Sequence, residues 1–139
     1  MSRERDLDDL LQITRARYQH RQQSFAKVIA EESRLRNELT RLDEMNRSTE
    51  TPQTAQTEMR AIGADVIWLA WLGRAKSALN SQLARVLAVK ENHLSEVRRA
   101  YGKVLVVEEL QSKLMAEQRK TRREKALSDA VTQAVHRDL

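Results

Sequence analysis

The chain has 139 residues, of which 32% are charged and 4% aromatic, and it contains three glycines, one proline and no cysteine. This composition provides few large side chains, so it disfavours a compact domain with a wide core and favours long helices. The absence of cysteine excludes disulfides and thiolate metal sites. No segment approaches the roughly 20 apolar residues of a membrane span, and acidic residues lie where a signal peptide would have its apolar core.

Residues 2–46 lack glycine and proline, and their apolar residues recur at alternating spacings of three and four. This spacing predicts a helix of on the order of 70 Å whose stripe packs against a partner helix. Thr14, Arg21 and Glu32 fall on the same stripe and are its weak points. The apolar stripe consists of Leu7, Leu11, Tyr18, Phe25, Val28, Leu35, Leu39 and Leu42.

Residues 47–57 are polar, rich in Ser and Thr, and contain Pro52, the single proline. Such residues favour turns and caps, and proline cannot continue a helix, so we expect a turn here. Thr51 or Thr57 is the expected cap of the next helix. A short connection predicts antiparallel packing of the flanking helices.

Residues 58–135 predict a second, longer helix with a less regular stripe and a stutter at Lys90 and Leu94. Gly63, Gly73 and Gly102 either mark kinks or close contacts or, as we interpret them, are tolerated weak points of that helix. We expect it to outrun the first helix by about 30 residues. Its stripe consists of Trp68, Leu72, Ala75, Leu79, Leu83, Val86, Leu94, Val97, Tyr101 and Val104. The predicted fold is all-α: one antiparallel coiled-coil hairpin with a longer second helix.

Charge is unevenly distributed, with a net of −1 through residue 59 and +6 in the remainder. The excess is sharpest at residues 119–125, where Arg119, Arg122 and Arg123 lie within one stretch. Such a patch suits an acidic protein surface, nucleic acid or lipid headgroups, or is simply a solvated helix face.

Two apolar stretches exceed what one seam can bury. In residues 64–73, Val66 to Leu72 cannot all face one partner helix, so a patch with Trp68 and Trp71 predicts a protein-binding site. The alternative is that the end of the first helix and the loop fold over it. Residues 101–110 pose the same problem, which either a partner or self-association would solve.

The sequence matches none of the catalytic or metal-binding motifs considered for it. The segment Gly73 to Ser77 lacks the glycine spacing of a phosphate loop, and His20, His93 and His136 are isolated. We therefore expect no catalytic residue, cofactor or metal site. Binding of nucleic acid by the basic cluster is disfavoured, because acidic residues dilute the cluster and it follows a hairpin rather than preceding a parallel zipper.

With its charged arms, polar break and aromatic opening of the long helix, the chain resembles the FliJ/YscO family of type III secretion stalk proteins. The residues that carry the resemblance are 2–46, 47–59, 66–72, 76–82 and 117–125. The resemblance implies a non-enzymatic stalk that enters a hexameric export ATPase, contacts the membrane export gate and binds export chaperones. It also implies a cytoplasmic location at the inner-membrane export apparatus.

By this resemblance the ATPase contacts would be Arg15, Arg17, Arg119, Arg122 and Arg123. The contacts to the gate or another partner would be Trp68, Trp71, Ala75, Ala78 and Gln82. The alternatives are a coiled-coil adaptor or scaffold outside secretion and, third, a basic nucleic-acid-binding coiled coil. Whether the system is a flagellum or an injectisome, and whether the chain is a monomer, stays open at this point.

Overall fold

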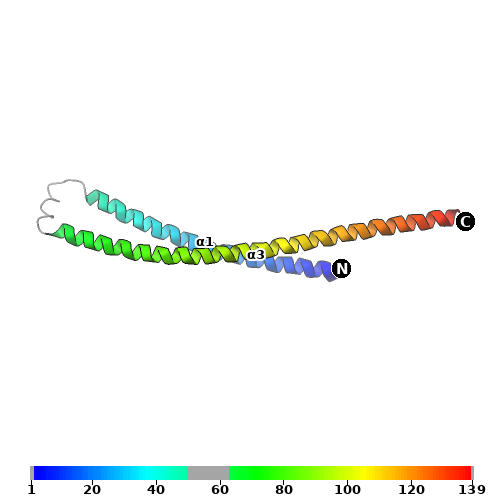
Figure 1. The fold of residues 1–139 in the computed structure, drawn as a ribbon, viewed down its shortest axis with the longest axis horizontal. Coiled ribbons are helices and arrows are strands. Elements are labelled where there is room, and N and C mark those ends of the chain that lie inside the picture. The colour runs from blue at the N-terminus through cyan, green and yellow to red at the C-terminus, as the bar shows by residue number, and fades with distance from the viewer. Residues whose placement is uncertain (1, 50–62, 139) are drawn as a thin grey trace. The chain divides into compact units, whose positions relative to one another are not determined.

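The computed structural model describes residues 2–49 and 63–138. Its two helices, α1 (Ser2–Thr49, 48 residues) and α3 (Ala64–Arg137, 74 residues), pack against each other as a hairpin (Figure 1). The all-α class and the longer second helix are confirmed. The chain divides into two compact units, which we call the terminal unit (residues 1–20 and 97–139) and the central unit (residues 21–96).

The helix boundaries differ from those expected. Helix α1 runs to Thr49, so residues 47–49 of the expected turn are helical. Gly63 has a φ of 80°, a left-handed conformation that L side chains rarely adopt, and it accepts a hydrogen bond from the Ile67 amide at 3.3 Å. Helix α3 begins at Ala64, so the interpretation of Gly63 as a weak point within a helix is wrong, and residues 58–62 of the predicted helix lie outside the described residues. Pro52 and the predicted caps Thr51 and Thr57 lie outside the described residues.

The predicted stripe of α1 is the face that packs on α3. Leu35 is fully buried, and the remaining apolar members are at least half-buried. Thr14 is buried as well, because its hydroxyl donates a hydrogen bond to the Leu11 carbonyl at 3.0 Å and so needs no water. Arg21 is exposed, and it extends from the stripe to Glu96 at 2.9 Å.

The seam of α3 is deepest at Leu72, Leu83, Val104 and Val107. Tyr101 departs from the prediction: 46% of it is exposed, and its ring lies beside the seam against Tyr18, with centroids 5.2 Å apart. Ala100 is half-buried instead, as are both His93 and Leu94. The remaining predicted members of the stripe, Trp68, Ala75, Leu79, Val86 and Val97, are half-buried.

Polar contacts between the helices follow an antiparallel register in each unit. In the terminal unit, Gln111 donates to Asp8 at 2.7 Å and Arg15 pairs with Glu108 at 3.2 Å. In the central unit, besides the Arg21–Glu96 pair, Lys90 lies 2.7 Å from Glu32, and Lys76 pairs with Asp43. The exposed pairs Arg15–Glu108 and Arg21–Glu96 stabilise little, so their main effect is on register, whereas the Lys90–Glu32 pair is largely covered.

Two glutamates of α1 have a lowered pKa. Hydrogen bonds from Lys90 and from Arg36 hold the pKa of Glu32 below its usual value. On the exposed face, the hydrogen bond from Arg34 does the same for Glu31, and Arg34 in turn has a raised pKa. The Glu32 pair joins the two helices, whereas the Arg34 cluster stabilises α1 locally.

Beyond Gln118, every described residue of α3 is exposed. Figure 1 shows no helix beside this stretch, which runs from yellow-orange to red. The positions that continue the seam become polar there, so they offer nothing for α1 to bury: Thr121, Lys125, Ser128 and Thr132. The exposed stretch is shorter than the expected overhang of about 30 residues, because α1 accompanies α3 as far as Gln118.

Candidate protein-binding surfaces

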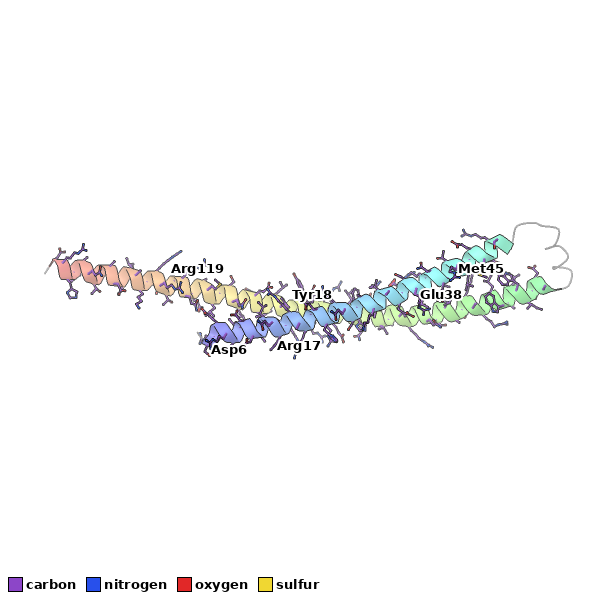
Figure 2. The ribbon with its side chains drawn as sticks, turned by 180° about the vertical axis from the view of Figure 1, so that it is seen from behind. Asp6, Arg17, Tyr18, Glu38, Met45 and Arg119 are labelled. Carbon is purple, nitrogen blue, oxygen red and sulfur yellow. The ribbon has the colours of Figure 1, made fainter. Side chains whose placement is uncertain are left out.

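Three of the predicted arginines form one basic face on α3 in the terminal unit. Arg119, Arg122 and Arg123 are spaced three and four residues apart, so they project from the same side of the helix, and all three are exposed. Figure 2 shows Arg119 on the stretch of α3 close to Asp6 of α1. We call these three residues the basic face.

A groove between the helices borders the basic face. It has a volume of about 440 Å³, and Arg119 and Arg122 line one side of it. Glu4 and Asp8 line the α1 side, and Leu7 lies between them. These carboxylates lower the positive potential on the groove side, so the basic face is strongest toward solvent.

Arg15 and Arg17 of α1 are not part of the basic face. Arg15 already pairs with Glu108, which lies eleven residues before Arg119, or about 16 Å along the helix at 1.5 Å per residue. Arg17 is exposed on α1 next to Tyr18, as Figure 2 shows. Of the five predicted contacts with the ATPase, the structure therefore groups three and leaves two apart.

The tryptophans form the predicted apolar patch near the start of α3. The rings of Trp68 and Trp71 stack with centroids 5.2 Å apart and planes 23° apart. Trp68 is half-buried, and its indole nitrogen is buried without a hydrogen-bond partner among the described residues. Around them, Val66, Ile67 and Leu69 are 69%, 71% and 51% exposed. We call these five residues the tryptophan patch.

The remaining predicted gate contacts continue from this patch along α3. Trp71, Ala75, Ala78 and Gln82 follow a spacing of four, three and four, which places them on one stripe beside the seam. Ala78 and Gln82 are exposed, whereas Ala75 is half-buried toward α1. The structure thus brings the predicted residues together, with Ala75 shared between the stripe and the seam.

Half of an apolar group in the terminal unit was missed from the sequence: its α3 members belong to residues 101–110, which were expected to need a partner, but its α1 members were not predicted. Leu10 and Ile13 of α1 are 42% and 51% exposed, and Val106 and Leu110 of α3 are 57% and 45% exposed. The sequence could have predicted that Leu10 and Ile13 of α1 are exposed, because both lie off the apolar stripe that packs against the partner helix. They were not singled out because isolated exposed apolar residues are common on protein surfaces.

No group of metal-binding side chains occurs among residues 2–49 and 63–138. In the same residues, neither helix has a stretch long and apolar enough to cross a bilayer. The chain was also compared with protein-family models, curated proteins and solved structures, and no significant match was found. Inferences about function therefore depend on the surfaces described above and on the resemblance of the sequence.

Proposed function

We propose that the chain is a non-enzymatic stalk, or coupling factor, of a type III export apparatus and that its terminal unit binds the hexameric export ATPase. The observation that carries this proposal is the basic face, whose three exposed arginines lie where α1 begins beside α3. The resemblance to the FliJ/YscO family supplies the identity of the partner.

The dimensions of the exposed stretch suit a ring pore. Residues 119–137 form a single helix of about 30 Å at 1.5 Å per residue. A single helix, about 10–12 Å wide with its side chains, is the narrowest regular element that a chain can insert. Arginines on its surface favour contact with a carboxylate-lined opening, and such contacts accelerate association more than they increase affinity.

The tryptophan patch supports a second partner. Tryptophan is enriched among the residues that dominate binding energy, and stacked rings surrounded by exposed aliphatic side chains form a ready anchor. In the proposed role this partner is the export gate, with export chaperones as further ligands. The protein would then work in the cytoplasm at the export apparatus.

The proposal is tested by measuring binding to the cognate export ATPase and stimulation of its ATP hydrolysis. Reversing the basic face with Arg119→Glu, Arg122→Glu and Arg123→Glu should abolish most of the stimulation, while the helical circular dichroism stays unchanged. The matched control places three reversals on exposed residues of the central unit, Lys27→Glu, Arg74→Glu and Arg85→Glu. It changes the net charge equally and should keep the stimulation.

Two results would overturn the proposal. Equal loss of stimulation in both triple variants would mean that net charge, not the basic face, matters. Failure of the wild-type chain to bind the ATPase would leave the coiled-coil adaptor outside secretion as the better account.

A further inference from the structure

Helix α3 carries a second heptad stripe on its flank, separate from the seam with α1. From Val106 to Val131 its members alternate between spacings of four and three, the pattern of a coiled-coil interface. Its apolar members are exposed: Val106 by 57%, Leu110 by 45%, Leu127 by 67% and Val131 by 55%. Its exposed central members are Lys113, Glu117, Lys120 and Glu124. We call these eight residues the flank stripe.

The flank stripe carries two of the three large apolar residues in the exposed stretch, Leu127 and Val131, whereas the third, Val135, is at a seam position near the end of α3. At seam positions that stretch has Thr121, Lys125, Ser128 and Thr132, which could not extend the contact with α1. Leu127 and Val131 lie instead in line with Val106 and Leu110. The apolar surface that begins beside α1 therefore continues where α1 is absent.

The flank stripe is complementary in charge to its own reverse, and it has two apolar residues at each end. Two apolar residues are followed by Lys, Glu, Lys and Glu, and then by two apolar residues. In an antiparallel pair of α3 helices, this order sets Val106 opposite Val131 of the second copy and Leu110 opposite its Leu127. The same register sets Lys113 opposite Glu124 and Glu117 opposite Lys120, so that every central charge meets its opposite.

We propose that two copies of this chain form an antiparallel dimer through the flank stripes of their α3 helices. A parallel, in-register dimer would place Lys113 against Lys113 and Glu117 against Glu117, so the charge order excludes it. Outside the eight residues, the antiparallel register sets Lys103 opposite Ala134 and Arg99 opposite Asp138, which directly follows α3. The occupant of the stripe is therefore a second copy, because its complement is the stripe itself.

Helix α1 provides a seat for the exposed stretch of the second copy. Leu110, Lys113 and Glu117 share a groove of about 340 Å³ with Leu7, Leu114 and the charged pair Arg3 and Asp6. One and two turns further along α1, Leu10 and Ile13 are exposed. Leu127 and Val131 of the second copy would thus fill a groove that two helices form, and the contact is reciprocal.

The dimer is independent of the proposed role in export. Around α3, Arg119 and Arg122 lie about 120° and about 180° from the flank stripe, so they stay exposed in the dimer, whereas Arg123 lies about 80° from the stripe, at the edge of the interface. Loss of ATPase binding would consequently leave the dimer intact, and loss of the dimer would leave the basic face intact. The two proposals can fail separately.

Charge-segregated variants test the interface. An acidic variant, Lys113→Glu with Lys120→Glu, has four glutamates at the centre of the stripe, and a basic variant, Glu117→Lys with Glu124→Lys, has four lysines. Analytical ultracentrifugation should give twice the chain mass of 16.1 kDa for the wild type and 16.1 kDa for each variant alone. An equimolar mixture of the two variants should restore the doubled mass, because every opposing pair then has opposite charges.

The orientation is tested by cross-linking, which is unambiguous because the chain has no cysteine of its own. Leu110→Cys mixed with Leu127→Cys should form a disulfide-linked dimer under mild oxidation. Either variant alone should not, since position 110 and position 110 of the second copy would lie about 25 Å apart along the helices. A parallel dimer would give the opposite result.

A wild-type chain that sediments at 16.1 kDa up to its solubility limit would overturn the proposal. So would doubled mass in both segregated variants, because the dimer would then use another surface. Unchanged helical circular dichroism of each variant at 25 °C shows that the monomers still fold, so that neither result can be attributed to misfolding.

Discussion

The ammonium of Lys90 lies 2.7 Å from a carboxylate oxygen of Glu32, in the middle of the seam between α3 and α1. Both side chains are largely covered, with 29% and 13% of their surface exposed, and Arg36 also contacts the carboxylate at 3.2 Å. A charged layer between apolar layers fixes the register of two helices, since any slip would separate the pair and leave two charges facing apolar residues.

Glu32→Gln should therefore lower the unfolding temperature at neutral pH. Because the hydrogen bonds lower the pKa of Glu32 in the folded chain from 4.5, the carboxylate stabilises the fold above pH 4.5. That contribution is lost as the pH falls through the lowered pKa. Thermal unfolding of the wild type and Glu32→Gln between pH 7 and pH 2 should converge at the acidic end. A difference that persists unchanged to pH 2 would contradict the assignment.

Replacing both charges by leucine, Glu32→Leu with Lys90→Leu, should keep or raise the unfolding temperature. An apolar layer of similar size avoids the desolvation of two charges, whereas either single change leaves one charge without its partner. The measurement is a double-mutant cycle of unfolding temperatures at pH 7. If the double variant is the least stable of the four proteins, the Glu32–Lys90 pair stabilises the fold in addition to fixing the register of the helices.

Leu35→Ala should destabilise the hairpin by about 2 to 4 kcal/mol, because Leu35 is 0% exposed and its removal leaves a cavity in the seam. The control is Val89→Ala in the same unit. Val89 is 47% exposed, so its truncation should change stability by less than about 0.5 kcal/mol. Urea unfolding followed by circular dichroism measures both. Similar effects of the two changes would mean that Leu35 is not part of the seam.

Two glycines should respond in opposite ways to alanine. Gly63→Ala should cost about 1 to 2 kcal/mol, because the left-handed φ of 80° strains an L side chain. Gly73→Ala should stabilise by about 1 kcal/mol, since Gly73 is within the helix and an added Cβ meets no atom within 4 Å. Thermal unfolding of the two variants is compared. A stabilised Gly63→Ala would show that α3 begins before Ala64.

Trp68→Ala with Trp71→Ala should reduce binding to the partner of the tryptophan patch by at least tenfold, as expected when two central anchors are lost. The unfolding temperature should fall less, because Trp71 is 44% exposed and Trp68 is only half-buried. The measurement pairs titration calorimetry against the export gate, the partner that we propose, with thermal unfolding. If the chain loses its fold before it loses binding, the tryptophans belong to the core of the hairpin.

Much of the fold could be predicted because helical periodicity is a local property. The stripe from Leu7 to Leu42 defines a single face of α1 whatever it packs against, and that face is indeed the one that meets α3. Spacings of three and four residues on a helix likewise predict that Trp68 lies beside Trp71 and that Arg119 lies beside Arg122 and Arg123. What these surfaces bind was suggested only by resemblance, and it stays a proposal.

The sequence by itself determined that two long helices with apolar stripes must pair, since neither stripe is stable in water alone. Tertiary structure decided what depends on the neighbour across the seam. It buried Thr14, turned Tyr101 out against Tyr18, and joined Glu32 to Lys90. Adjacent residues on a helix point about 100° apart. The position of the opposing helix therefore decides which of two neighbouring side chains is buried, and no local sequence pattern encodes that position.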